Sequence, residues 1–170
     1  MNGITNMKLD HVAYRVKDRH KTALLIEGML GYAFNTEFDV EFDDGSVAKC
    51  IVMIPPVNPI VMVREGHEIF ISDGDEKSIV GKWVKERGSG GVHHMAYKVT
   101  EIQSIVNKWR DLNIDFLTED VIDCPDDDLK QIFTKPLEEF GGVIIELIER
   151  GAKGFCQNSV KDLMNSTKGL

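Results

Sequence analysis

A ten-residue segment occurs twice in the chain, and this repeat constrains the fold more than any other feature of the sequence. Residues 9–18 read LDHVAYRVKD, and residues 92–101 read VHHMAYKVTE. Both copies place a histidine, an alanine, a tyrosine and a valine at the same positions. The two shared histidines, His11 and His94, lie 83 residues apart, about half of the 170-residue chain. A repeat of this period predicts two similar modules.

The segments that follow each copy are also alike. Residues 18–31 and 101–113 carry apolar residues at helical spacing. Each helical stretch precedes three strand-like stretches separated by turn residues, at 32–42, 48–54 and 59–65 in the first half and at 114–120, 129–135 and 142–150 in the second. This pattern predicts an α/β (α+β) fold of two βαβββ modules.

The length of 170 residues is close to that of one average domain, so we expect residues 1–170 to form a single domain. Within this domain we place module one at about 8–70, a linker helix at about 73–91, module two at about 92–150 and a tail at about 151–170.

Composition limits the function classes. Twenty basic and 28 acidic residues give a net charge of −8, which disfavours nucleic acids and anionic membranes as partners because their phosphates repel such a surface. No apolar run reaches the roughly 20 residues that span a bilayer, and the first residues lack a secretion-signal pattern. Cys50, Cys124 and Cys156 form no CxxC motif, which argues against a disulfide framework or a thiolate zinc site. We therefore expect a cytoplasmic protein with reduced thiols.

The alternation of side chains along a strand assigns the histidines to faces. In the first copy, His11 shares a face with Ala13 and Arg15, while Tyr14 and Val16 lie on the face that would pack under the following helix. The second copy places His94 on the face equivalent to that of His11. Its neighbour His93 points to the opposite face, so the histidine doublet supplies one ligand and not two.

A lone carboxylate interrupts the apolar stretch GVIIELIER. Glu146 shares a face with Ile144 and Ile148, and burying an unpaired carboxylate costs several kcal/mol. It therefore needs a partner, either a metal ion or a cation such as Arg15 or Lys98. Two imidazoles and one carboxylate from separate strands form the facial triad of non-haem Fe(II) sites, which leaves roughly three coordination positions open.

These residues and modules resemble the vicinal-oxygen-chelate superfamily, which includes glyoxalase I, methylmalonyl-CoA epimerase and extradiol dioxygenases. The resemblance implies an eight-stranded, metal-binding cup. The segment QIFTKPLEEFGGVIIELIER (131–150) is similar to the corresponding segment of the 4-hydroxyphenylpyruvate dioxygenase family. GGVHHMAYKV (90–99) resembles that family's second metal-histidine segment, and GFCQNSVKDLMNS (154–166) resembles its closing segment.

The resemblance to these dioxygenases implies roles for six residues. His11, His94 and Glu146 would bind Fe(II), or another divalent metal such as Co, Mn, Ni or Zn. Gln131 and Phe133 would line the substrate pocket, and Phe155 would lie on the capping segment. The substrate would be a small 2-oxo acid, or another chelating molecule, that reacts with O₂. Because these dioxygenases carry a second domain, apolar surface at its place would favour a homodimer.

Two alternatives stay open. A methylmalonyl-CoA epimerase or glyoxalase would carry a fourth ligand on the last strand of module one, where the alignment places Val61, which cannot ligate a metal. However, residues 77–99 resemble the epimerase linker at least as well as the dioxygenase one. The superfamily also includes metal-free proteins that bind antibiotics, in which the triad would be dispensable.

Overall fold

The computed structural model describes residues 7–124 and 128–151. The chain divides into two compact units. The N-terminal unit is Asp10–His93, and the C-terminal unit combines Met1–Leu9 with His94–Leu170. Residues 152–170 of the predicted tail, with Phe155 and Cys156, lie outside the described residues.

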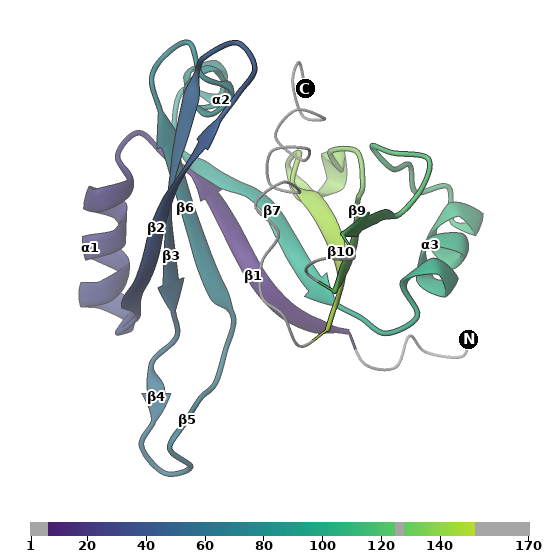
Figure 1. Ribbon diagram of the computed structural model, residues 1–170, viewed down its shortest axis with the longest axis horizontal. Helices are drawn as coiled ribbons and strands as arrows, with labels where there is room; N and C mark the ends of the chain where they lie inside the picture. Colours follow the sequence, from purple (N-terminus) through teal and green to yellow (C-terminus); the bar gives the residue numbers. More distant parts are fainter. Residues whose placement is uncertain (1–6, 125–127, 152–170) are drawn as a thin grey trace. The chain divides into compact units, whose positions relative to one another are not determined.

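The N-terminal unit contains a sheet and two helices, α1 and α2 (Figure 1). Its strands follow the order β2-β3-β6-β1, in which β1 and β6 run parallel and the other neighbours antiparallel. Helix α1 begins after Asp18, whose side chain accepts a hydrogen bond from the Lys21 amide, and it ends at Gly31, which adopts a left-handed φ of 71°. The elements are β1 (Lys8–Arg15), α1 (Arg19–Leu30), β2 (Ala33–Glu41), β3 (Val47–Ile54) and β6 (Glu68–Gly74).

The core of this unit lies between α1 and the sheet. Tyr14 of β1 and Val16, which directly follows the strand, pack in one cluster with Ala23 and Ile26 of α1, which confirms the predicted helix-facing side of the first strand. The strands β3 and β6 complete the cluster with four buried residues, Ile51, Met53, Ile69 and Ile71.

The predicted strand at 59–65 is wrong. The chain instead forms a separate small hairpin of β4 (Val57–Asn58) and β5 (Val63–Arg64). Pro55, Pro56 and Pro59 explain this, because proline cannot donate to a strand ladder. The last strand of the module is β6, and α2 (Ile79–Arg87) follows it inside the predicted linker.

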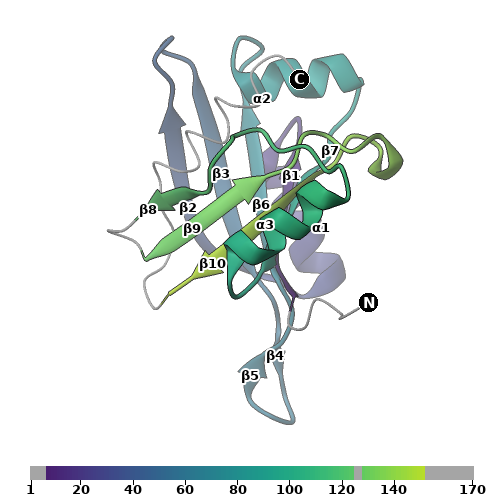
Figure 2. The same ribbon diagram turned by 90° about the vertical axis from the view of Figure 1, so that its right-hand side faces the viewer.

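The C-terminal unit repeats the same succession of elements. Its strands follow the order β7-β10-β9-β8, with β7 and β10 parallel and the other neighbours antiparallel. Helix α3 lies across β9 and β10 (Figure 2). The elements are β7 (Gly91–Lys98), α3 (Ile102–Asp111), β8 (Ile122–Cys124), β9 (Leu129–Phe133), a 3-10 turn (Glu138–Phe140) and β10 (Ile144–Arg150).

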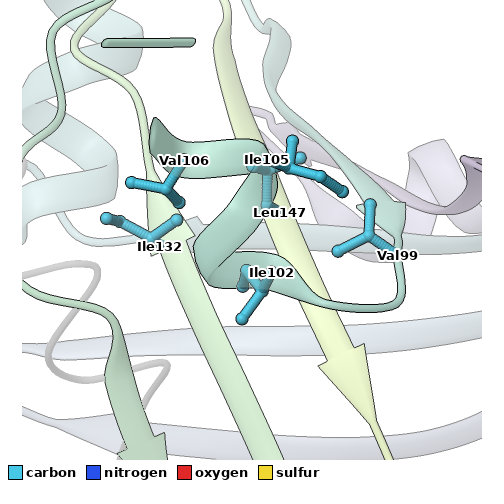
Figure 3. Packing of buried hydrophobic residues seen from close by; sticks show 6 residues of the cluster. All are labelled: Val99, Ile102, Ile105, Val106, Ile132 and Leu147. Atoms are coloured by element: carbon cyan, nitrogen blue, oxygen red, sulfur yellow. The ribbon is translucent and has the colours of Figure 1, made fainter. Parts of the chain in front are cut away.

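The core of the C-terminal unit lies under α3. Ile132 of β9 and Leu147 of β10 are fully buried against this helix. Figure 3 shows the cluster, which comprises Val99, Ile102, Ile105, Val106, Ile132 and Leu147. Because Leu147 faces the helix, its neighbours Glu146 and Ile148 face the other side of the sheet. Both units therefore have the predicted βαβββ form, and the predicted α/β fold is confirmed. The strand predicted at 114–120 is wrong, because the strand that follows α3 is β8 at Ile122–Cys124. None of the helices in the described residues combines the length and apolar content needed to cross a bilayer.

Candidate metal centre

His94 and Glu146 lie together in the C-terminal unit because their strands are parallel neighbours. The register pairs Ile144 with His94 and Glu146 with Ala96, so the two side chains are close on the same face. The distance between His94 Nε2 and Glu146 Oε2 is 3.5 Å, and the side chains are 10% and 3% exposed. Two ligands bound to one divalent ion at about 2.0–2.2 Å are roughly 3–3.5 Å apart. The pair therefore fits two positions of a coordination shell.

The face around this pair is apolar. Phe133 of β9 lies opposite Glu146 in the antiparallel register, and its ring meets the His94 ring edge-on with centroids 6.3 Å apart. Ala96 and Ile148 are buried nearby with Leu129. Such surroundings exclude water and raise the strength of any electrostatic interaction with a bound ligand.

Gln131 shares the face of Phe133, as the strand alternation predicts. It lies opposite Ile148, is 3% exposed, and its Nε2 has no hydrogen-bond partner among the described residues. A buried amide donor without a partner costs about 1–3 kcal/mol. The structure thus places one polar donor on an otherwise apolar surface.

His11 belongs to the N-terminal unit, on β1, and is 2% exposed. Its Nδ1 lies 2.9 Å from Asp10 Oδ2, and its ring centroid lies 4.7 Å from that of Phe70. A carboxylate can only accept a hydrogen bond, so Nδ1 carries the proton in this contact and Nε2 is the ring atom able to ligate a metal. His11 therefore offers Nε2 as a ligand atom.

The two units can be compared through their strand registers. In the C-terminal unit, Glu146 lies beside Ala96, two residues after His94. In the N-terminal unit, Phe70 lies beside Ala13, two residues after His11. Phe70 therefore occupies the place equivalent to Glu146. The placement of Val61 at a fourth ligand position is wrong, because Val61 lies in the β4–β5 hairpin. Phe70, which does lie at that position, cannot ligate a metal either.

His93 is separate from this face, as predicted. Its ring is 4% exposed and packs edge-on against Trp83 of α2, with centroids 5.7 Å apart. His93 is therefore a packing residue of the N-terminal unit.

Arg15, which the sequence offered as a possible cation partner of Glu146, is a buried cation of the N-terminal unit. It is 2% exposed, and its guanidinium lies 5.7 Å from the centre of the Trp83 ring. Burial lowers the pKa of Arg15 to about 9, against a smaller raising effect of Cys50, so the group is still charged at neutral pH. Burial likewise raises the pKa of the Cys50 thiol to about 12, which keeps it neutral and unreactive. In the sequence, the strand alternation that places Arg15 on the same face as His11 is the feature that could have predicted its burial.

Comparisons with known proteins agree with the fold. The family model for the glyoxalase/bleomycin resistance protein/dioxygenase superfamily matches residues 10–133. None of the curated proteins matches the sequence at a significant level. Among solved structures, a triple mutant of 4-hydroxymandelate synthase from Streptomyces coelicolor has a TM-score of 0.78 at 20% identity, over 95% of this chain and 53% of that chain. Methylmalonyl-CoA epimerase from Mycobacterium tuberculosis has a TM-score of 0.62 at 21% identity, over 89% of this chain and 92% of that chain. The chain thus spans about half the length of the synthase and nearly all of the epimerase.

Proposed function

The chain belongs to the glyoxalase/bleomycin resistance protein/dioxygenase superfamily, and from this premise we propose that it is a mononuclear Fe(II)-dependent dioxygenase that acts on a small 2-oxo acid. His11, His94 and Glu146 are the proposed metal ligands. One observation carries the proposal: the donor set consists of two imidazoles and one carboxylate, while Phe70 occupies the place where a fourth ligand would lie. Three protein ligands with open positions are typical of non-haem Fe(II) oxygenases.

The chemistry of the donor set suits a metal ion. A buried His-His-Glu group can bind a divalent cation. Glu146 is 3% exposed, and a carboxylate at this depth is stabilised by the positive charge of such an ion. The 3.5 Å between His94 Nε2 and Glu146 Oε2 agrees with ligation of one ion by both.

The residues around the ligands support binding of a small polar substrate. When bound, Fe(II) would supply the redox chemistry that activates O₂ and oxidises the substrate. The Gln131 amide would donate a hydrogen bond to a substrate oxygen, which satisfies its buried Nε2. Phe133 would form an apolar wall beside the ligands and keep water from the reacting atoms.

O₂ consumption tests the proposed reaction. After anaerobic loading with Fe(II), we expect O₂ uptake and matching CO₂ release with at least one member of a panel of 2-oxo acids. Glu146→Gln keeps the size of the side chain but removes its charge, and we expect it to lose uptake with the same substrate. A metal-loaded protein that consumes no O₂ with any 2-oxo acid would contradict the dioxygenase proposal.

A second candidate is a metal-dependent isomerase or lyase of the epimerase and glyoxalase type. The match over 92% of an epimerase chain favours it, and the absence of a fourth ligand at the position of Phe70 counts against it. Exchange of solvent deuterium into an acyl-CoA without O₂ uptake would support this candidate. A third candidate, a metal-free binding protein, requires that the purified chain bind its ligand equally well after treatment with a chelator.

Asp10 orients His11 in this proposal, so Asp10→Asn should weaken metal binding. The amide can donate to Nδ1, which would favour the tautomer with the proton on Nε2, the atom that must ligate. We expect the affinity for Co²⁺, measured by competition with a coloured chelator, to fall by about 10- to 100-fold. Asp111→Asn, at an exposed position at the end of α3, is the matched control and should bind as the wild type does. Equal affinities for the Asp10→Asn variant and this control would refute the role of Asp10.

A further inference from the structure

Exposed apolar side chains are concentrated in the N-terminal unit. Of the twelve large hydrophobic residues that are exposed in the described part of the chain, only Leu112 and Phe140 lie in the C-terminal unit. The other ten form two groups. The first group, here called the apolar arm, is the exposed side of the β4–β5 hairpin and comprises Val57, Ile60, Val61, Met62 and Val63. The second, here called the helix patch, comprises Leu24, Leu25, Met29, Leu30 and Phe34 of α1 and β2.

The arm has a defined conformation, and its two strands form a sheet of their own, separate from the main sheet. Figure 1 shows it projecting beyond the ends of β3 and β6. Asn58 fixes its turn, because its side chain accepts from the Ile60 amide and its carbonyl accepts from the Met62 amide. Met62 adopts a φ of 55°, a left-handed conformation that costs energy for a residue with a side chain. This strained turn presents Ile60 and Met62 to solvent, 88% and 75% exposed.

The helix patch includes a concave site. A cavity of about 250 Å³ lies between α1 and the strands β2 and β3. Leu24 and Phe34, both more than half exposed, form part of its wall. The buried side chains of Ala23, Ile51 and Met53 also line it, and the polar residues His20 and Glu27 complete the lining. The cavity can therefore receive an apolar side chain but offers little to a charged one.

We propose that the arm of one copy of this chain inserts into the α1–β2 cavity of a second copy, and that the reciprocal contact closes a two-fold dimer. The arm and the cavity are both apolar, and each chain carries one of each. Two copies can therefore bury both surfaces through two identical contacts. The ten side chains are 42% to 88% exposed, so the apolar area that each copy offers is on the order of the roughly 800 Å² that each partner buries in a stable interface. The preformed arm also reduces the entropy lost on binding. This inference is independent of the proposed catalytic function.

The oligomeric state tests the proposal. By light scattering after size exclusion, the wild-type chain is expected at about twice 19.1 kDa at micromolar concentration. An arm variant (Ile60→Asp with Met62→Asp) and a cavity variant (Leu24→Asp with Phe34→Asp) are each expected to run as monomers, with dimer dissociation constants raised at least about 100-fold. The control variant Leu112→Asp carries its charge on the other unit and should remain a dimer. Thermal melts identify any variant that has failed to fold.

A mixing experiment distinguishes this arrangement from other dimers. A heterodimer of the arm variant and the cavity variant keeps one intact arm and one intact cavity, facing each other. Mixing the two monomeric variants should therefore restore dimers, weaker than those of the wild type. A mixture that stays monomeric would overturn the exchange of arms. A wild-type chain that is monomeric, or whose arm inserts into neutral phosphatidylcholine vesicles instead, would overturn the proposal as a whole.

Discussion

Replacing Glu146 by alanine should abolish tight binding of a divalent metal ion. Glu146 is the only carboxylate of the proposed ligand set, and its loss leaves two neutral imidazoles to hold a dication. Loss of a residue that hydrogen-bonds to a metal ligand can lower metal affinity by roughly 100-fold. Loss of a ligand itself should cost more, so we expect the affinity for Fe²⁺ or Co²⁺ to fall by more than this. Metal analysis of the purified protein and chelator competition measure the effect.

The adjacent histidines provide the control for this experiment. His94→Ala removes a proposed ligand and should lose metal as Glu146→Ala does. His93→Ala removes a ring that packs on Trp83 and should retain nearly full metal content. If both histidine variants lost metal to the same extent, the assignment of His94 alone to the metal-facing side of β7 would be wrong.

Replacing Gly81 by alanine should destabilise the fold severely. Gly81 lies in the first turn of α2, and a Cβ there would be 1.9 Å from the Asp75 carbonyl oxygen and 2.7 Å from its carbon. These backbone atoms cannot move freely, because Ser78 holds them in place. The Ser78 hydroxyl donates to the Asp75 carbonyl, and the Ser78 amide donates to the Asp75 side chain. The Ser78 hydroxyl oxygen also accepts from the Gly81 amide. We expect the free energy of unfolding to fall by about 3 kcal/mol or more. Denaturant titration monitored by circular dichroism measures the loss.

Gly28 is the matched control for Gly81, since both lie in helices. A Cβ at Gly28 of α1 would meet nothing within 4 Å. Gly28→Ala should therefore gain about 0.5–1 kcal/mol from the better helix propensity of alanine. Similar losses in both variants would show that the close approach of Asp75 is not the cause.

The local patterns of the sequence predicted the modules and the faces of the repeated strands correctly. The repeated segment predicts the equivalent strands β1 and β7, each followed by a helix. Alternation places Tyr14 under α1 and separates His94 from His93. It also puts Gln131 and Phe133 on one face of β9. These properties depend on residues close together in the chain, so one sequence is enough to find them.

Local pattern failed between β3 and α2. The apolar residues 59–65 resemble a strand, but they are exposed in a hairpin bounded by prolines. The strand that completes the module is β6, where Ile71 lies between Ile51 of β3 and Tyr14 of β1. Cross-strand partners so far apart in sequence stabilise a strand more than its own propensity does.

The sequence alone therefore determined the two-module fold and the residue types able to ligate a metal, because periodicity and repetition are properties of the chain itself. Only the tertiary structure decided that Phe70 takes the place equivalent to Glu146, that Arg15 is a buried cation, and that Ile60 and Met62 stand in solvent. Strand register and burial depend on residues from distant segments of the chain, so a local sequence pattern cannot predict them.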